Sequence, residues 1–178
     1  MEKRMTDEST TTWQGGTEHW TNKGEVRLFL WNRKPAAGAP KRGTILFVHG
    51  SSMASQPTFD LHVPGRSDSS AMQYFAALGY DAWTMDNEGY GRSTKNRPQN
   101  NDISNGAEDL AAGSDFILGQ TGAKSLLVYG ISSGALKAAL FAERHPERVS
   151  RLALDAFVWT GEGSPTLAER KKKLDQFK

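Results

Sequence analysis

The stretch LLVYGISSGALKAAL, residues 126–140, decides how this chain folds. An apolar run that suits a buried strand leads into Gly130, Ser132, Ser133 and Gly134, and a segment rich in alanine and leucine that suits a helix follows. Glycine inside regular structure lowers stability, so two glycines around a pair of serines indicate a turn that ordinary residues cannot make. We therefore expect a sharp turn from strand to helix at this place.

The rest of the chain alternates between strand-like and helix-like segments. Apolar runs predict strands at 26–31, 44–50, 81–87, 125–131 and 151–159. Helical patterns fall at 69–78, 106–122 and 134–146. Strands that alternate with helices of about 10–15 residues favour an α/β fold, in which helices cover both faces of a mostly parallel sheet.

The composition is that of an ordinary globular domain. Of the 178 residues, 37% are hydrophobic and 24% are charged, and the net charge of +2 gives no reason to expect a nucleic-acid partner. The absence of cysteine excludes disulfides, thiolate metal sites and a catalytic thiol. No apolar run approaches the roughly 18 residues of a membrane span, and the polar start has no signal-peptide core. We therefore expect a soluble, cytoplasmic protein.

Three predicted strands end in glycines and polar residues. These ends are HGSSM at 49–53, DNEGYGRST at 86–94 and GISSGA at 130–135. In a mostly parallel sheet, ligands bind beyond the carboxyl ends of the strands, so these three turns are expected to meet at one site. GYGRST is not a dinucleotide fingerprint and no phosphate-binding loop is present, so we expect no cofactor and no metal.

The same three turns carry a resemblance to a known family. YGISSGA has the form G-x-S-x-G between a strand and a helix, which is the setting of a nucleophile elbow. ILFVHGSS at 45–52 resembles the HG oxyanion loop of the α/β-hydrolase superfamily, and YDAWTMDNEGYGRS at 80–93 resembles its D-x-x-G-x-G-x-S stretch. AERHPERVSRLALDAF at 142–157 is similar to the end of a helix and the sixth strand of that family. The resemblance covers residues 25–160 and is closest to lipase-like and esterase-like members with a helical lid.

The resemblance implies roles for the serines. Ser132 takes the position of the nucleophile, on a strained turn whose neighbours must be small. The amide of Ser133, at the start of the helix, is implied as one oxyanion donor, because unpaired N–H groups and the helix dipole favour negative charge there. The second donor maps to the amide of Ser51, with Ser52 as the weaker alternative.

The acid and the base are not evident in the sequence. In the family, the histidine of the HG turn shapes the oxyanion loop, which assigns His49 a structural role, while the acid and base usually follow the seventh and eighth strands. Asp155 and His62 remain the alternatives within this chain, and Asp86 is expected to fix its own loop. We therefore expect residues 1–178 to be the N-terminal part of a longer hydrolase, with an α/β sheet that is incomplete at its C-terminal end and not competent alone.

Two further segments surround the predicted site. The loop 51–67 exceeds the usual 2–6 or so residues of a strand-to-helix connection, so we expect it to line the substrate entrance with Met53, Phe59 and His62. Residues 1–160 are expected to form the hydrolase core with its first six strands, and residues 161–178 to begin a helical lid. That lid segment shows a capping-box spacing at Thr166 and Glu169, and an apolar face of Leu167, Leu174 and Phe177.

The predicted function is hydrolysis of a carboxylic ester, or a related acyl bond, through an acyl-enzyme on Ser132. Amides, lactones, carbamates and the carbon–carbon bond of diketones remain open as substrates. Serine at the elbow argues against epoxide hydrolase and haloalkane dehalogenase chemistry, which uses an aspartate there in this fold. The alternative is a non-catalytic protein that keeps the pocket and binds a ligand or partner. The expected partner is a small ester-like molecule, and the sequence predicts no oligomeric state.

Overall fold

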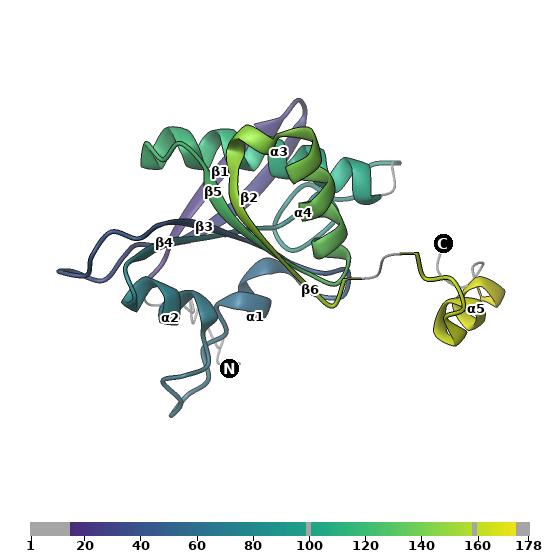
Figure 1. Ribbon diagram of the computed structural model, residues 1–178, viewed down its shortest axis with the longest axis horizontal. Coiled ribbons are helices and arrows are strands. Elements are labelled where there is room, and N and C mark those ends of the chain that lie inside the picture. Colours follow the sequence, from purple (N-terminus) through teal and green to yellow (C-terminus); the bar gives the residue numbers. More distant parts are fainter. Residues whose placement is uncertain (1–14, 99–100, 158–159, 174–178) are drawn as a thin grey trace, which may run out of the picture.

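A six-stranded sheet forms the centre of the molecule (Figure 1). The computed structural model describes residues 15–98, 101–157 and 160–173. Its strands are β1 (Thr17–Lys23), β2 (Val26–Arg33), β3 (Gly43–Val48), β4 (Tyr80–Met85), β5 (Leu126–Ile131) and β6 (Val149–Asp155). Their order across the sheet is β1-β2-β4-β3-β5-β6, with β4, β3, β5 and β6 parallel and β1 and β2 antiparallel to their neighbours. The predicted α/β class with a mostly parallel sheet is confirmed.

Helices cover both faces of this sheet. On one face lie α1 (Ser55–Phe59) and α2 (Ala71–Ala77), and on the other lie α3 (Ile103–Thr121) and α4 (Ser133–Arg144) (Figure 1). Alternate residues of β3 enter two separate cores: Leu46 packs with the α3 and α4 side chains, and Phe47 packs with those of α1 and α2. A strand buried on both faces is what a continuous apolar run predicts.

The strand β1, the helix α1 and the short 3-10 helix η1 (Pro146–Arg148) were not predicted. The segment of β1, TEHWTNK, is mostly polar, yet it pairs with β2 along its whole length and places Trp20 against Phe29. An edge strand exposed to solvent needs little apolar sequence, because its neighbour supplies the hydrogen bonds. The short helix α1 lies within the stretch that we expected to be a loop.

Several element ends differ from the prediction for local reasons. The helix α3 begins at Ile103, because the Asp102 side chain accepts a hydrogen bond from the Asn105 amide at 2.8 Å and caps the helix three residues early. It ends as predicted, at Gly122 with φ of 67°. The strand β6 runs over Val149–Asp155, whereas we predicted 151–159.

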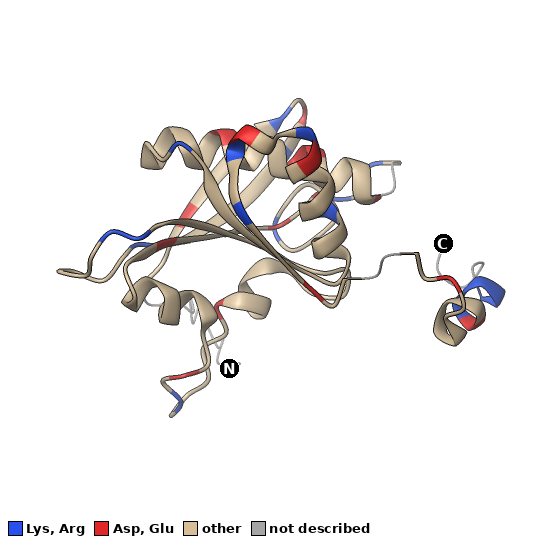
Figure 2. Ribbon diagram, viewed as in Figure 1, with Lys and Arg blue, Asp and Glu red and all other residues tan. Residues whose placement is uncertain are grey.

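The helix α5 (Pro165–Lys172) stands apart from the sheet in Figure 1, and Figure 2 shows its basic residues. Its cap is Ser164, which accepts from the Leu167 amide, and the predicted cap at Thr166 is wrong because Pro165 already opens the helix. Leu174 and Phe177 of the predicted apolar face lie outside the described residues. The assignment of 161–178 as the start of a lid stays a prediction, as does the core at 1–160.

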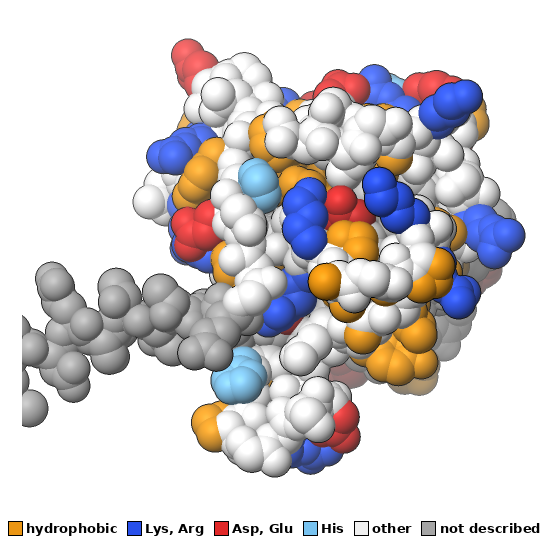
Figure 3. All heavy atoms as spheres, turned by 90° about the vertical axis from the view of Figure 1, so that its left-hand side faces the viewer, with side chains coloured by type: hydrophobic (Ala, Val, Ile, Leu, Met, Phe, Trp, Pro, Cys, Tyr) orange, Lys and Arg blue, Asp and Glu red, His pale blue; other side chains and the backbone are white. Residues whose placement is uncertain are grey.

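The surface carries both signs of charge. On the face shown in Figure 3, Lys and Arg side chains lie among apolar and acidic ones and do not gather into a large basic area. Within the described ranges, no helix combines the length and hydropathy that crossing a bilayer requires.

Candidate active site

Ser132 occupies a strained turn between β5 and α4. Its φ of 58° and ψ of −126° lie in a region that residues with a side chain seldom adopt, at a cost of about 1–3 kcal/mol. Its amide donates to the Asp155 carbonyl at 3.0 Å, which ties the turn to the end of β6, and its side chain is exposed. The sharp strand-to-helix turn expected from the sequence is therefore present.

Glycines allow three backbone segments to meet at this turn. A β-carbon at Gly134 would overlap the carbonyl oxygens of Val48 and His49, so α4 can approach the end of β3 only with glycine at that position. A β-carbon at Gly130 would come within 2.5 Å of the Gly134 carbonyl oxygen. Both glycines thus serve close approach, as the sequence indicated.

The turn after β3 lies beside Ser132. A β-carbon at Gly50 would be 3.2 Å from the Ser132 Cβ and 3.6 Å from its Oγ. Ser51 follows Gly50 directly and is exposed. Ser133 is the first residue of α4, so its amide is among the unpaired N–H groups of the helix N-terminus. The fold therefore brings the segments of Ser51, Ser132 and Ser133 to one edge of the sheet.

His49 is fully buried behind this turn. Its Nδ1 lies 2.6 Å from the Gly50 carbonyl oxygen, and its Nε2 lies 3.1 Å from the Asn87 amide nitrogen. Because the amide can only donate, Nε2 accepts and the ring hydrogen sits on Nδ1. Burial lowers the pKa of His49, which favours this neutral form. Both ring nitrogens are engaged, so the geometry suits the structural role that the resemblance implies.

Asp86 holds the loop that follows β4. Its two carboxylate oxygens accept hydrogen bonds from the amides of Ser55 and Arg92, each at 2.8 Å. A β-carbon at Gly91 would overlap this carboxylate, which explains the glycine. The expectation that Asp86 fixes its own loop is confirmed, and Asp86 also anchors the start of α1.

The remaining histidines lie elsewhere. The His19 ring on β1 packs 4.8 Å from the Trp83 ring, and burial lowers the pKa of His19. His145 caps the far end of α4, about 20 Å along the helix from Ser132 by the rise of 1.5 Å per residue. His62 is exposed between α1 and α2, and no hydrogen bond joins it to Ser132 in the described part of the chain. Neither His19 nor His145 is thus placed to act as a base for Ser132.

Asp155 contacts a residue that the sequence analysis missed. Its Oδ2 accepts a hydrogen bond from the Tyr129 hydroxyl at 2.6 Å. Burial and this hydrogen bond together raise the pKa of Tyr129 to about 12. Alternation along β5 and β6 could have suggested the contact, because Tyr129 pairs in register with Ala153, two residues before Asp155 on the same face.

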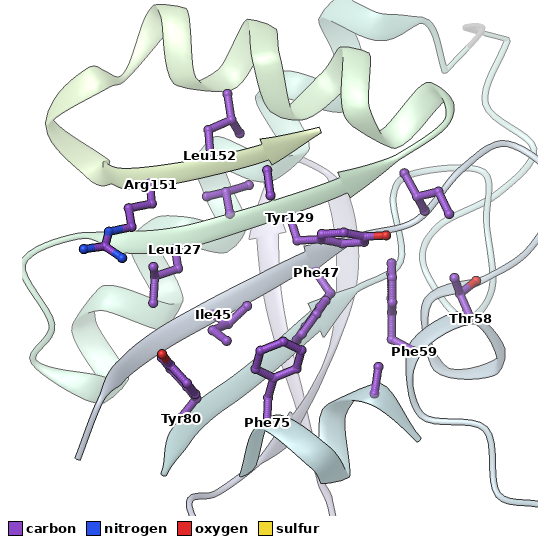
Figure 4. A pocket seen from close by; sticks show the side chains of 14 residues that line it. Ile45, Phe47, Thr58, Phe59, Phe75, Tyr80, Leu127, Tyr129, Arg151 and Leu152 are labelled. Carbon is purple, nitrogen blue, oxygen red and sulfur yellow. The ribbon is translucent and has the colours of Figure 1, made fainter. Parts of the chain in front are cut away.

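The three predicted substrate contacts do not share one cavity. Phe59 is buried and lines a groove of about 630 Å³ on the α1 and α2 side of the sheet, beside Phe47 and Tyr129 (Figure 4). This groove reaches Ile131, the residue before Ser132. Met53 is 49% exposed, and neither Met53 nor His62 lines the groove. Their role as substrate contacts stays a prediction.

The segments that meet at this site offer backbone amides and serine hydroxyl groups. No group of three or more His, Cys, Asp or Glu residues that could hold a metal ion occurs among residues 15–98, 101–157 and 160–173. A serine held on a strained turn, with a helix N-terminus and a second backbone turn beside it, is an arrangement that can attack a carbonyl and stabilise the resulting oxyanion.

Solved structures of known proteins are similar in fold to this chain. A structure of a membrane phospholipase A, described as a novel bacterial virulence factor, is 25% identical, with a TM-score of 0.65 over 90% of this chain and 46% of its own. A putative lipase from Acinetobacter baumannii AYE is 18% identical, with a TM-score of 0.67 over 91% of this chain and 49% of its own. An epoxide hydrolase from Vigna radiata is 15% identical, with a TM-score of 0.67 over 90% of this chain and 47% of its own. The last two show the fold alone, and the chain spans about half the length of all three.

A known protein family also matches most of the chain. The family described as serine aminopeptidase, S33, matches residues 39–172, which include all three turns of the site. That match covers about three quarters of the sequence, so the chain belongs to the serine aminopeptidase S33 family of the α/β-hydrolase superfamily.

Proposed function

We propose that Ser132 is the nucleophile of a serine hydrolase that cleaves a carboxylic ester or a related acyl bond. The observation that carries this proposal is the left-handed backbone of Ser132 at the exposed junction of β5 and α4. Strained backbone positions of this kind cluster at functional sites, and this one places a serine hydroxyl group at the carboxyl end of the parallel strands.

The proposed reaction has two steps. The Ser132 Oγ attacks the carbonyl carbon while its proton passes to a base, and the carbon–oxygen bond to the alcohol breaks as that alcohol takes up the proton. Water then attacks the acyl-enzyme in the same way, releases the acid and restores the hydroxyl group. We propose that the amides of Ser133 and Ser51 hold the oxyanion in both steps.

The names of the similar proteins indicate two substrate classes. The phospholipase A and the putative lipase are named for ester chemistry, whereas the family description names an aminopeptidase. A serine at the elbow is compatible with both, because ester and amide hydrolysis share the acyl-enzyme route. A panel of aryl esters and aminoacyl amides, varied in acyl length, separates these substrate classes.

The deciding test is covalent labelling with a fluorophosphonate, which modifies an activated serine. It should be run on the longest form of the protein that can be expressed. We expect labelling to disappear in Ser132→Ala and to persist largely in Ser133→Ala, because the proposal uses the amide of Ser133 and not its side chain. Labelling that persists in Ser132→Ala would contradict the assignment.

A second function uses the same pocket without catalysis. It is favoured by one observation: all four histidines lie in the described ranges, and none is hydrogen-bonded to Ser132 there. This function would be supported if fluorophosphonate does not label the protein, while an acyl ligand binds reversibly and with the same affinity to the wild type and to Ser132→Ala.

A further inference from the structure

A lysine is buried beneath the candidate active site. Lys137 lies one helical turn after Ser133 on α4 and is only 1% exposed. Its Nζ has no hydrogen-bond partner or ion pair among the described residues. Removing an ammonium group from water without a partner is costly, so burial lowers the pKa of Lys137 to about 8. A helix surface that only needed packing would be better served by leucine or methionine.

The surrounding helices are shaped to hold this side chain. A β-carbon at Gly106 of α3 would lie within 2.8 Å of the Cγ, Cδ and Cε atoms of Lys137, so the glycine opens a slot for the lysine stem. The charges that face the slot from α3 are Asp109 and its capping residue Asp102, and both favour the protonated form of Lys137. Asp109 itself is paired with Lys23 of β1 at 2.5 Å.

The ammonium group connects to the HG turn through an aromatic ring. The Nζ of Lys137 lies 5.1 Å from the centroid of the Tyr90 ring, which is within the range of a cation–π contact. The Tyr90 ring stands edge-on to the His49 ring, with 4.9 Å between centroids. The ammonium group of Lys137 and the ring of His49 thus both contact Tyr90.

His49 can perform its structural role only when it is neutral. Its Nε2 accepts a hydrogen bond from the Asn87 amide, and a protonated ring would turn a second donor toward that amide. The bond between the ends of β3 and β4 would then be lost. The charged groups that act on His49 are Lys137 from α4, which opposes protonation, and Asp86 from the end of β4, which favours it.

We propose that Lys137 is a positioning residue whose buried positive charge adds to the effect of burial in keeping His49 uncharged, and so helps to hold the turn of Gly50 and Ser51 against Ser132. Lys137 touches neither the nucleophile nor a substrate in this role. The link to catalysis rests on the proposed function, because the position of the Gly50–Ser51 turn affects the reaction only if the Ser51 amide serves as an oxyanion donor. The electrostatic effect on His49 does not depend on that function.

The test follows the protonation of His49 itself. Nitrogen chemical shifts of the imidazole ring are measured by NMR against pH in the wild type, in Lys137→Met and in Lys124→Met, an exposed lysine that serves as the control. Methionine keeps the length of the lysine stem and removes the charge, and replacing a buried charge in this way is often neutral or stabilising. We expect the midpoint of His49 protonation to rise in Lys137→Met and to stay unchanged in Lys124→Met.

An unchanged His49 midpoint in Lys137→Met would overturn the proposal, and Lys137→Gln provides a second neutral side chain if methionine prevents folding. A merely structural role for Lys137 would alter stability without moving this midpoint. Repeating the titration in Ser132→Ala separates the two proposals, since the His49 shift requires no nucleophile. Where fluorophosphonate labelling of Ser132 is observed, its loss on the acid side should move to higher pH in Lys137→Met.

Discussion

Gly50 follows β3 and Ser132 follows β5, and a β-carbon added at Gly50 would lie only 3.2 Å from the Ser132 Cβ, although more than eighty positions separate the two residues in the chain. Because glycine has no β-carbon, Gly50 leaves room for the Ser132 side chain, which a larger residue would crowd. Two turns that lie far apart in the sequence therefore form one site, and the distance between them leaves no room for a β-carbon at Gly50 without a shift of the backbone.

We predict that Gly50→Ala disturbs catalysis more than it disturbs folding. The new β-carbon would lie 3.2 Å from the Ser132 Cβ and 3.3 Å from the Ile131 carbonyl oxygen, so the turn must shift by a few tenths of an ångström. Because small displacements of reacting groups lower the reaction rate strongly, we expect kcat to fall about tenfold or more, with little change in the melting temperature. The rate is measured on the best ester of the substrate panel.

Gly119→Ala is the matched control for this substitution. A β-carbon at Gly119 on α3 meets nothing within 4 Å, so alanine should stabilise the helix by about 0.5–1 kcal/mol and leave the rate unchanged. Equal losses of kcat in Gly50→Ala and Gly119→Ala would contradict the prediction, because the loss could then not be due to crowding of Ser132.

We predict that Ser132→Gly is more stable than Ser132→Ala. The backbone at Ser132 is held at φ of 58°, where glycine fits without strain and alanine does not. The difference in the free energy of unfolding should be about 1 kcal/mol, after allowance for the greater chain entropy of glycine when unfolded. Urea denaturation of the two variants measures it, and a less stable Ser132→Gly would mean that the turn is not strained.

We predict that Asp155→Asn lowers the pKa of Tyr129 from about 12 while leaving it above the ordinary value of 10.0. The carboxylate contributes a hydrogen bond and a charge, but burial is the larger cause and persists in the variant. The tyrosinate absorbance is followed against pH, and Tyr129→Phe identifies the signal of this residue among the four tyrosines.

The same contact affects stability at alkaline pH. Between pH 10 and about 12, the native state keeps a phenol proton that the unfolded chain has released, so the contribution of Tyr129 to stability falls as the pH rises through this range. Asp155→Asn should therefore narrow the pH interval over which this loss occurs.

We predict that the buried lysine makes the protein more stable as the pH rises from about 8 toward 10.5. In this range the native state has released the Lys137 proton and the unfolded chain still holds it, so the unfolded state binds more protons and unfolding becomes less favourable with rising pH. The full effect is about 3 kcal/mol, at about 1.4 kcal/mol for each pH unit. Urea denaturation at a series of pH values measures it. In Lys137→Met this increase in the free energy of unfolding should be absent. The same increase in that variant would show that another group causes it.

The sequence by itself determined the elements around the elbow. Apolar runs identified β2 to β6, and the pattern of Gly130, two serines and Gly134 identified the turn that leaves β5, because glycine content and hydrophobic period are local properties of the chain. Gly122 at the end of α3 was predictable for the same reason, since its φ of 67° suits glycine. The family resemblance rests on these same local signals.

Only the tertiary structure decided which of these parts meet. The strand β1 forms because β2 offers it a partner, although its own sequence is polar. Lys137 falls on an ordinary helical pattern, and its burial depends on Gly106 of another helix. The close approach of Gly50 to Ser132 joins the turns after β3 and β5, and the hydrogen bond from Tyr129 to Asp155 joins β5 to β6. Such contacts depend on the order and register of strands, which long-range pairing sets and no local stretch of residues encodes.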